Sequence, residues 1–355
     1  MSNSLYMEQI SLICNSALPW NKFKDAVIII SGATGMVGKT LIDVLVQRNR
    51  QYGDNIKIIA LSRNYRGAKD RLGEYLDNGQ VEYLPCDVND KIPECGHADY
   101  IIHAASNTHP LQYAKDSIGT ITANVIGTKN LLDYAVAYGT RQFCFISSVE
   151  IYGENRGDIE KFSEDYLGYI DSNSLRAGYP ESKRLGEALC NAYGNTFSLK
   201  FVIPRLSRVY GPTMLMEDTK AISQFIKKAA SGQDILLKSE GTQIYSYSFV
   251  TDAVSGILYT MLLGKGGNAY NVADPDSDIS LKELAWTLAD IAKTQLLFEA
   301  PSELEKKGYS TATKAMLNAG KLKGLGWEPR VHMREGLECT IDYLKTKRTG
   351  SKASN

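Results

Sequence analysis

The sequence has few of the features that mark secreted, metal-binding or nucleic-acid-binding proteins. Its 355 residues include six cysteines, which form no Cys-x-x-Cys pair and show no metal-ligand spacing. We therefore expect reduced thiols and no metal site. Lys plus Arg and Asp plus Glu number 40 each, so the net charge is zero. Without a global basic field, neither nucleic acid nor an anionic membrane is an expected partner.

Long hydrophobic runs are missing as well. The longest, such as 26–30, have the length of a strand and fall far short of the ~20 residues of a membrane span. The first residues carry neither the basic nor the apolar region of a signal peptide. We therefore expect a cytoplasmic protein, and its hydrophobic fraction of 43% is typical of globular domains.

Strand-like runs and helical periodicity alternate along the first two thirds of the chain. Strands are expected at 26–30, 56–61, 81–84, 100–103, 142–146 and 199–203. Helices are expected between them at 39–48, 122–138 and 179–193. This alternation predicts an α/β protein with a doubly wound, largely parallel Rossmann sheet.

Beyond about residue 206 the alternation loosens, which indicates a smaller substrate-binding domain interleaved with the first. A helix at 220–230, a Tyr- and Ser-rich segment at 244–249, a strand at 268–272 and a helix at 334–345 stand out. The expected parts are an N-terminal extension at 1–24 with a packing helix at 6–14, a dinucleotide-binding domain at 25–205, a substrate domain at 206–345 and a polar tail at 346–355. A segment near 245–275 is expected to return to the large sheet.

The segment SGATGMVG at 31–38 follows the first strand and opens a helix, the context that a dinucleotide-binding turn needs. Its spacing is Gly-x-x-Gly-x-x-Gly. Glycines let the backbone approach a pyrophosphate, and the helix N-terminus supplies N–H donors. The expected cofactor-binding residues of this turn are Gly32, Thr34, Gly35, Met36, Val37 and Gly38.

Three later segments fit the same cofactor. Asp87-Val88 follows the third strand, where the carboxylate would take the adenine amino group, although a turn Asp is the alternative. Ala104 and Ala105 follow the fourth strand, where small residues let the chain pass beneath a dinucleotide. After the second strand no carboxylate is present for the ribose hydroxyls, and Arg63 is available for a 2′-phosphate. These residues favour NADP over NAD, and an Arg63 that is simply solvated is the alternative.

Tyr179 and Lys183 stand four residues apart in the segment YPESK and share one helix face. A phenol is a poor base at neutral pH. A nearby ammonium and a positively charged nicotinamide ring would lower its pKa toward the working range. The pair predicts hydride transfer at a hydroxyl-bearing carbon, with both residues also touching the cofactor.

Ser147, Ser148 and Glu150 follow the strand at 142–146 and so lie at the carboxyl edge of the sheet. Ser147 is expected at the cofactor, and Ser148 is expected to hold the substrate oxygen that Tyr179 deprotonates. Glu150 would remove a proton beside a newly formed ketone, or else simply pair with a backbone amide. Asn124 would organise the same wall, or bond to a bent helix backbone.

Together these motifs resemble the extended short-chain dehydrogenase/reductase family, in its NAD-dependent epimerase/dehydratase group acting on nucleotide sugars. The resemblance runs over nearly the whole chain after residue 25, through GATGMVG, HAAS, NVIGT, SSVEIYG, YPESK, PRLSRVYGP and LGWEP. It is strongest to UDP-glucuronate decarboxylases and dTDP-glucose 4,6-dehydratases, whose diphosphate-enclosing segments are similar to 209–218 and 241–254.

The resemblance implies roles for particular residues. Ser148, Tyr179 and Lys183 would form the oxidising triad and Glu150 the auxiliary acid/base. It further implies bound NAD, a nucleotide-sugar substrate, a homodimer packed through the helices of Asn124 and Tyr179, and a place in polysaccharide precursor biosynthesis.

The chain departs from the family at several positions. Where the dehydratases have Thr-Asp-Glu, it has Ser148-Val149-Glu150, which lacks the Asp that protonates the leaving hydroxyl. The family's Asn before YGP is Arg208, and its Arg in the GxQxR stretch is Tyr245. If that Arg anchors phosphate or carboxylate, Arg208 or Lys220 must substitute for it. The expected substrate-binding residues are Ser148, Arg208, Lys220 and Tyr245.

The sequence leaves several activities open. The first expectation is an enzyme that oxidises C4 of a nucleotide sugar and processes the 4-keto intermediate by decarboxylation or elimination. A 4-epimerase needs the same Tyr, Ser and Lys without Glu150. An NADPH-dependent keto-sugar reductase would need external reductant in every turnover, and a cofactor sensor would need neither Tyr179 nor Lys183.

Overall fold

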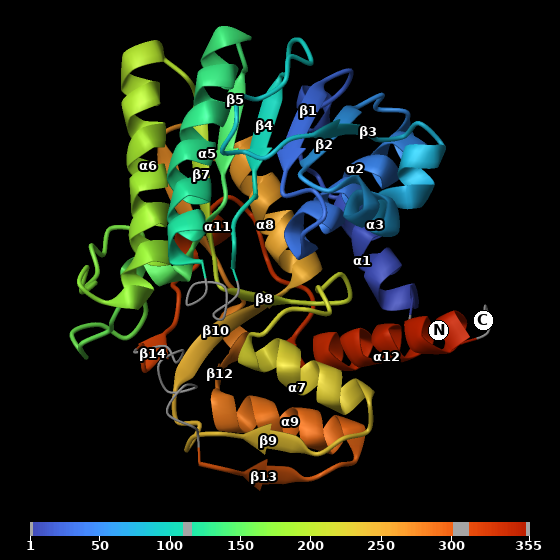
Figure 1. Ribbon diagram of the computed structural model, residues 1–355, viewed down its shortest axis with the longest axis vertical. Helices are drawn as coiled ribbons and strands as arrows, with labels where there is room; N and C mark the ends of the chain where they lie inside the picture. Colours follow the sequence, from blue (N-terminus) through green and yellow to red (C-terminus); the bar gives the residue numbers. More distant parts are fainter. Residues whose placement is uncertain (1–2, 109–115, 301–311, 353–355) are drawn as a thin grey trace.

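Eight strands form one sheet in the upper part of the molecule (Figure 1). The structure is a computed structural model that describes residues 3–108, 116–300 and 312–352. The order is β11-β7-β5-β4-β1-β2-β3, with β6 beside β7, and every pairing is parallel. The strands are β1 (Val27–Ser31), β2 (Lys57–Ser62), β3 (Glu82–Pro85), β4 (Tyr100–His103), β5 (Gln142–Phe145), β6 (Ser147–Ser148), β7 (Phe201–Leu206) and β11 (Asn268–Val272).

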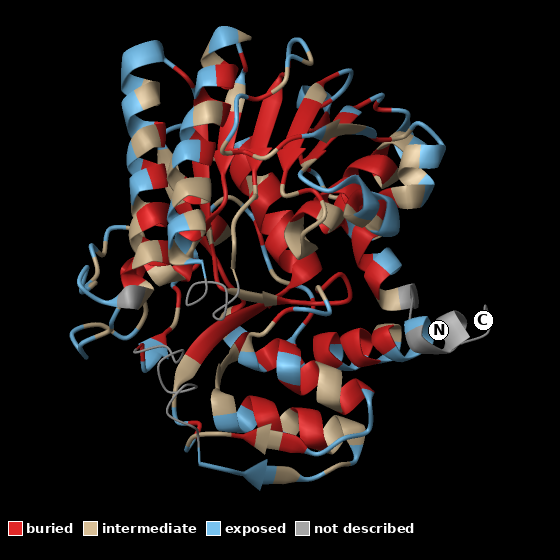
Figure 2. Cartoon of the chain, in the orientation of Figure 1, coloured by how far each residue is buried: buried red, intermediate tan, exposed pale blue. Residues whose placement is uncertain are grey.

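Helices cover both faces of this sheet because its strands are hydrophobic on both sides (Figure 2). In β1, Ile28 and Ile30 join the core that includes residues of α1 (Asn3–Cys14), α2 (Met36–Tyr52) and α8 (Val250–Leu263). Ile29, which points the other way, joins the core of α5 (Ser117–Ala137) and α6 (Gly178–Phe197). A further helix, α3 (Tyr65–Asp77), connects β2 to β3.

A smaller part lies below the sheet in Figure 1. Its main sheet has the order β12-β10-β14, with β8 beside β10. A two-stranded sheet pairs β13 with β9. The strands are β8 (Arg208–Tyr210), β9 (Ile235–Leu237), β10 (Ile244–Phe249), β12 (Asp278–Ser280), β13 (Leu296–Phe298) and β14 (Lys314–Ala315). The helices are α7 (Ala221–Ala230), α9 (Leu281–Ala292) and α12 (Met333–Lys352). The short helix α11 (Gly320–Lys323) packs instead against β11 and α8 of the upper part.

The predicted Rossmann sheet is confirmed, and its strands lie within three residues of the expected limits. The expected return of the chain is made by α8 and β11, since β11 pairs with β7. The Tyr- and Ser-rich strand β10 instead pairs within the lower sheet. The helices α3, α8 and α9 were not expected, and α12 continues beyond residue 345 to Lys352.

The helix expected near the N-terminus packs closely against the large sheet's helices. The Tyr6 hydroxyl donates to Asp43 of α2 at 2.6 Å, and burial raises the pKa of this phenol. Arg48 donates to the carbonyl of Cys14 at 2.6 Å and pairs with Asp54. Residues of α1 are therefore part of the main hydrophobic core.

Two other expectations bear on the class of protein. No helix among residues 3–108, 116–300 and 312–352 is long and apolar enough to cross a membrane. The six cysteines are all free thiols, and five of them are buried.

Candidate active site

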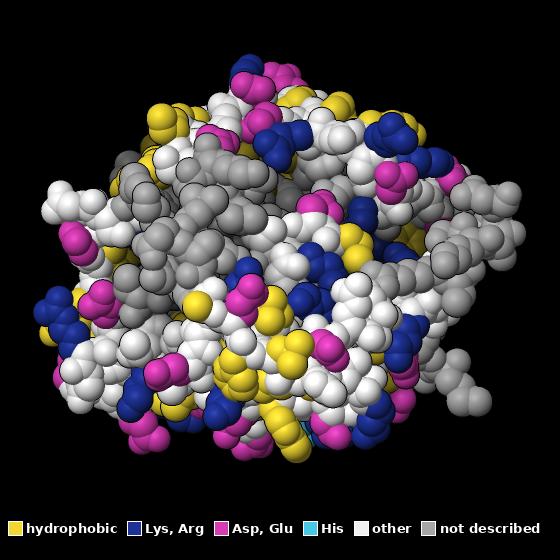
Figure 3. All heavy atoms as spheres, turned by 60° about the horizontal axis from the view of Figure 1, so that its bottom comes forward, with side chains coloured by type: hydrophobic (Ala, Val, Ile, Leu, Met, Phe, Trp, Pro, Cys, Tyr) yellow, Lys and Arg dark blue, Asp and Glu magenta, His cyan; other side chains and the backbone are white. Residues whose placement is uncertain are grey.

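A cavity of about 730 Å³ opens between the carboxyl edge of the large sheet and the smaller part. Its volume lies in the range of small-molecule and cofactor sites. Figure 3 shows the molecule from below, with Lys and Arg side chains near the centre of that face. The cavity brings together most of the predicted site residues: Gly32, Gly35, Met36, Val37, Gly38, Ala104, Ser147, Ser148, Glu150, Tyr179, Lys183, Arg208, Lys220 and Tyr245.

Thr34, Arg63, Asp87, Val88, Ala105 and Asn124 do not line this cavity. The Arg63 side chain is 70% exposed and lies 3.8 Å from the Asp87 carboxylate. The Asp87 carboxylate also accepts the N–H of Asn89 at 3.0 Å, which is the turn arrangement that the sequence left as an alternative.

The glycine turn holds its shape by close backbone contacts. Gly32 has φ of +68°, and a Cβ there would lie 2.7 Å from the backbone of Ala104. A Cβ at Gly38 would lie 2.3 Å from the Gly32 carbonyl oxygen. Side chains at these two positions would therefore push the turn away from β4 and α2.

The N-terminus of α2 faces the cavity without a side-chain cap. The N-cap residue is Gly35, which has no side chain that could cap the helix. The next residues, Met36, Val37 and Gly38, line the cavity. The first N–H groups of a helix have no intrahelical acceptor. Uncapped donors at a glycine turn fit the diphosphate of a dinucleotide, which would accept these hydrogen bonds.

The Arg71 side chain, on α3, joins the glycine turn to the loop after β8. Its guanidinium donates to the carbonyl of Thr34 at 3.1 Å and to the carbonyl of Thr213 in the loop after β8. The Thr213 hydroxyl contacts the carbonyl of Met36 at 3.2 Å. Burial lowers the pKa of Arg71. Sequence reasoning missed Arg71 because its partners stand 37 and 142 residues away.

Asn124 is fully buried and joins two parts of the cavity wall. Its side-chain oxygen accepts from Ser106 at 2.8 Å, and its amide donates to Ser182 at 2.9 Å. Ser106 lines the cavity, and Ser182 precedes Lys183. Asn124 thus bonds to Ser106 of the cavity wall and to Ser182 on α6, and it does not itself line the cavity.

Tyr179 and Lys183 lie one helical turn apart on α6 and are both buried. Burial raises the pKa of Tyr179, while its hydrogen bond with Ser148 acts in the opposite direction. The Glu150 carboxylate also acts to raise this pKa, and the lowering that the sequence led us to expect from Lys183 is not found. The same burial lowers the pKa of Lys183 to about 7. Its ammonium donates to the carbonyl of Ile146 at 2.8 Å.

Glu187 continues the row of Tyr179 and Lys183 by one further turn. Its carboxylate pairs with Arg205 at 2.7 Å and accepts from Ser147 at 2.6 Å. Its negative charge acts to raise the pKa of Lys183, against the effect of burial. We missed Glu187 in the sequence, although its spacing of four residues from Lys183 was a signal for it.

Glu150 and Arg208 form an ion pair in the cavity. The Ser148 hydroxyl accepts the backbone N–H of Glu150 at 3.2 Å, which orients the short helix η2 (Val149–Tyr152). The Glu150 carboxylate lies 3.2 Å from Nη2 of Arg208. The Arg208 guanidinium in turn stacks on the ring of Tyr245, 3.6 Å from its centroid. Arg208 and Tyr245, two of the positions at which the sequence departs from the pattern that it resembles, are therefore in direct contact.

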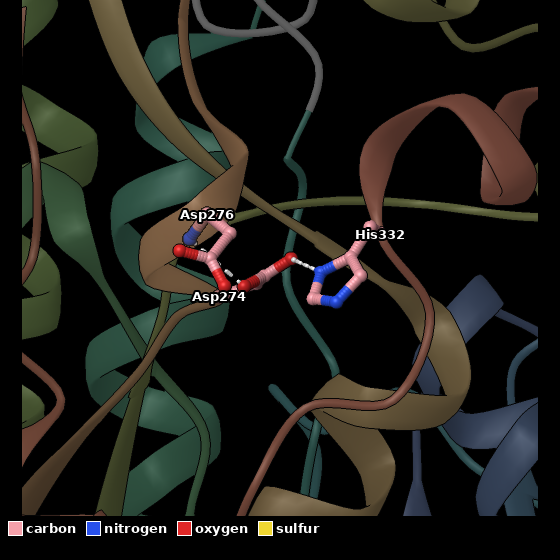
Figure 4. A group of neighbouring side chains, drawn as sticks. All are labelled: Asp274, Asp276 and His332. Carbon is pink, nitrogen blue, oxygen red and sulfur yellow. Dashed lines mark hydrogen bonds and ion pairs between the residues drawn. The ribbon is translucent and has the colours of Figure 1, made fainter.

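One cluster outside the cavity has the composition of a metal site. Asp274, Asp276 and His332 lie close together (Figure 4). Asp274 caps the helix η4 (Pro275–Ser277), accepting from the backbone of Asp276 and from Ser277, and His332 lies 3.2 Å from the same carboxylate. This pairing raises the pKa of His332. Since both Asp274 oxygens are already engaged, we assign the cluster a capping role.

The geometry suits a particular kind of chemistry. A phenol, a serine hydroxyl and a buried ammonium lie beside a turn that is shaped for a dinucleotide phosphate. This set fits hydride transfer between a nicotinamide ring and an alcohol carbon, with the phenol carrying the proton. Glu150 adds a carboxylate next to the same reacting centre.

Comparisons with known proteins agree with this assignment. Residues 28–273 match the model of the NAD dependent epimerase/dehydratase family. UDP-glucuronic acid decarboxylase 5 of Arabidopsis thaliana is 30% identical over 87% of this chain and 86% of its own length. UDP-glucuronic acid decarboxylase 1 of Xenopus tropicalis is 28% identical over 90% of this chain and 72% of its own length.

Solved structures share the fold. DesIV, a dTDP-glucose 4,6-dehydratase from Streptomyces venezuelae with NAD and TYD bound, has a TM-score of 0.78 at 24% identity, over 91% of this chain and 98% of that one. The UDP-glucuronic acid 4-epimerase of Bacillus cereus, with UDP-glucuronic acid and NAD, has a TM-score of 0.75 at 21% identity, over 90% of this chain and 99% of that one. The chain thus belongs to the NAD dependent epimerase/dehydratase family.

Proposed function

We propose that this enzyme oxidises C4 of a nucleotide-linked sugar acid and processes the resulting 4-ketone by decarboxylation. The observation that carries the proposal is the presence of Ser148, Glu150, Tyr179 and Lys183 in the cavity that also contains the glycine turn. The relatives named UDP-glucuronic acid decarboxylase, which match over most of the chain, support the choice of substrate class.

The chain's own residues account for the proton movements. Tyr179 takes the proton of the C4 hydroxyl, and Ser148 bonds to the same oxygen. Because burial raises the pKa of Tyr179, the phenolate needs positive charge beside it, which Lys183 helps to supply. Bound NAD would accept the C4 hydride and later return it to the ketone. Glu150 then assists proton transfer at C5, next to the ketone.

Lysine side chains that line the cavity suit the nucleotide diphosphate. Lys220 lies in the cavity, where its ammonium is 3.2 Å from Asp218 and 3.2 Å from the Thr108 hydroxyl. Lys228 and Lys238 also line the cavity. Lysine ammonium groups are point charges that bind phosphate well. We propose Lys220 as the main diphosphate contact.

The test is to incubate the purified protein with UDP-, dTDP-, GDP- and CDP-linked sugars, including UDP-glucuronate. Mass spectrometry and NMR follow the products. Release of carbon dioxide from a nucleotide uronate supports the proposal. Loss of water would indicate a dehydratase. No turnover of any sugar by the NAD-bound protein would refute the whole proposal and favour a reductase or a cofactor sensor.

A 4-epimerase is the second candidate, because Tyr179, Ser148 and Lys183 also serve C4 inversion. An epimerase would convert the substrate without loss of mass and with inverted coupling at C4. Glu150→Gln separates the two functions: it should cripple decarboxylation, which needs proton transfer at C5, and spare epimerisation.

We propose that NAD is the working cofactor and that Arg63 allows NADP to bind as well. Family membership supports NAD. Arg63 follows β2, where an acidic residue would exclude a 2′-phosphate, and its side chain is exposed. Dissociation constants for both cofactors test this, and Arg63→Ala should weaken NADP alone. Equal weakening of both would refute a role at the 2′-phosphate.

We further propose a homodimer packed through α5 and α6. Both helices carry exposed aliphatic side chains: Ile118 is 75% exposed, and Ile121, Ile126 and Leu185 are also exposed. Light scattering on the wild type and on Ile121→Lys tests the interface, with the variant expected to be monomeric. We also propose a dinucleotide-binding domain at residues 25–205 with a returning segment near 245–275, a substrate domain at 206–345 interleaved with it, and a cytoplasmic role in polysaccharide precursor synthesis.

A further inference from the structure

Arg208 is held in an incompletely satisfied position in the cavity. Its Nη2 lies 3.2 Å from Oε1 of Glu150, and the guanidinium plane packs 3.6 Å from the centre of the Tyr245 ring. Its Nη1 is buried and has no hydrogen-bond partner among the residues that the structure describes. The side chain as a whole remains 18% exposed.

This arrangement leaves hydrogen-bonding capacity unused. A guanidinium carries five N–H donors in a planar fork that matches two oxygens of one anion. Here Nη2 reaches one oxygen of Glu150, while Nη1 forgoes its bond inside the protein. An anion that offered two oxygens to the fork would form two charge-assisted bonds, and one buried donor would no longer be unsatisfied.

The neighbours of Arg208 indicate which anion this is. The inference rests on the proposed function, in which Ser148 and Tyr179 meet the C4 oxygen and Glu150 meets C5. A group that binds Arg208 therefore lies beside C5. In a nucleotide uronate the carboxylate carbon, C6, is bonded directly to C5, whereas the diphosphate is joined to C1, on the other side of the ring oxygen.

We propose that the sugar carboxylate takes Arg208 away from Glu150 when the substrate binds. Arg208 is then the residue that selects uronates over neutral hexoses. Glu150, no longer paired with the guanidinium, becomes available for proton transfer at C5 only when a carboxylated sugar is present. The Tyr245 ring packs against the guanidinium plane, and it would stabilise Arg208 by cation–π contact whether Arg208 pairs with Glu150 or with the substrate carboxylate.

The exchange makes a prediction that a simple anchoring role does not. Glu150 and the substrate carboxylate compete for one guanidinium. Removing the charge of Glu150 should therefore strengthen uronate binding, although Glu150 itself lies in the active site. Removing Arg208 should abolish the preference for the uronate.

The experiment measures dissociation constants of UDP-glucuronate and UDP-glucose by calorimetry on the NAD-bound protein, with every variant and its wild-type reference carrying Tyr179→Phe so that the sugar binds without being turned over. We expect Arg208→Met to weaken UDP-glucuronate roughly tenfold or more, with UDP-glucose little changed. Arg208→Lys should lose most of the preference, because a point charge cannot bind two oxygens in the plane of a fork. Glu150→Gln should bind UDP-glucuronate about tenfold more tightly than the wild type, which is the effect of one charged hydrogen bond at the lower end of its range.

Lys220→Met is the matched control, since it removes a cation from the same cavity on the proposed diphosphate side. It should weaken both ligands by the same factor. If Arg208→Met also weakens both ligands equally, Arg208 binds the diphosphate and the proposal is overturned. If Glu150→Gln binds UDP-glucuronate no more tightly than the wild type, the exchange is overturned.

Failure of the proposed function is read from a different result. Wild-type protein that turns over no nucleotide uronate would refute the function itself. Wild-type turnover together with an Arg208→Met variant that keeps its preference for UDP-glucuronate would refute only the assignment of Arg208. Unfolding curves of each variant show that the binding changes come from folded protein.

Discussion

Replacing Lys183 with Met removes a buried ammonium and retains most of its aliphatic length, and we expect the cofactor-free protein to become more stable at pH 7. Lys183 is 3% exposed. Its ammonium has one described hydrogen bond, to the carbonyl of Ile146, and lies 4.8 Å from the ring centre of Phe145. Burial outweighs these contacts and lowers the pKa of Lys183 from 10.5 to about 7.

The size of the effect follows from this shift. One pKa unit corresponds to ~1.4 kcal/mol, so the shift opposes the charged lysine by ~5 kcal/mol. Losing the bond to Ile146 and the contact with Phe145 offsets about half of this amount. The expected net gain in the free energy of unfolding is ~2 kcal/mol at pH 7.

The gain should depend on pH in a defined direction. Between the folded pKa of about 7 and the unfolded value of 10.5, the unfolded wild type carries a proton that the folded one lacks. Wild-type stability therefore rises with pH in this window, by ~1.4 kcal/mol per unit, and this contribution is constant below pH 7. The advantage of Lys183→Met should be full at pH 6 to 7 and be lost by about pH 9.

Urea unfolding at pH 6.5, 7.5 and 9 measures this difference on protein stripped of cofactor. Lys200→Met, at an exposed lysine, is the matched control and should track the wild type. A Lys183→Met variant that is less stable than the wild type at pH 7 would refute the reasoning. So would a difference that does not change with pH.

Three further substitutions test the site. Gly32→Ala places a Cβ 2.7 Å from the Ala104 backbone at φ of +68°, and should cost more than ~2 kcal/mol and weaken NAD binding in a fluorescence titration. Gly53→Ala is its control: it has φ of +63° with nothing within 4 Å and should cost only ~1 kcal/mol. Glu187→Gln leaves the Arg205 charge buried without its partner and should cost ~3–5 kcal/mol in urea unfolding; a loss under 1 kcal/mol would contradict a buried pair. Tyr179→Phe should bind nucleotide sugar normally yet form NADH at least ~100-fold more slowly, and wild-type rates would remove Tyr179 from the mechanism.

Local patterns in the sequence were enough to predict the large sheet and the cofactor turn. The central strands of the sheet, such as β1, are nearly continuous apolar runs, and the glycine turn lies between a strand and a helix. Tyr179 and Lys183 are paired by helical spacing alone. Each of these features depends on residues within a few positions of one another. The spacing of residue types along a helix or strand is therefore enough to predict it.

The spacing of apolar residues did not predict every element correctly. The helix α8 is buried along nearly its whole length, so it shows no polar face, and amphipathic periodicity does not distinguish it from a strand run. The strand β10 belongs to the lower sheet and not to the returning segment. The sheet to which a strand belongs is decided by its pairing with strands distant in the sequence, and a local pattern of residues does not contain that information.

The sequence by itself determined the Rossmann sheet, the dinucleotide turn and the Tyr179–Lys183 pair, because neighbouring residues and the repeat of strand and helix specify them. Only the tertiary structure decided which side chains Arg208 contacts. Its contacts with Glu150 and Tyr245 join β8 to η2 and β10, and such contacts arise when distant segments meet across the cavity. Burial, which sets the pKa of Lys183, is likewise a property of the packed molecule and not of any segment.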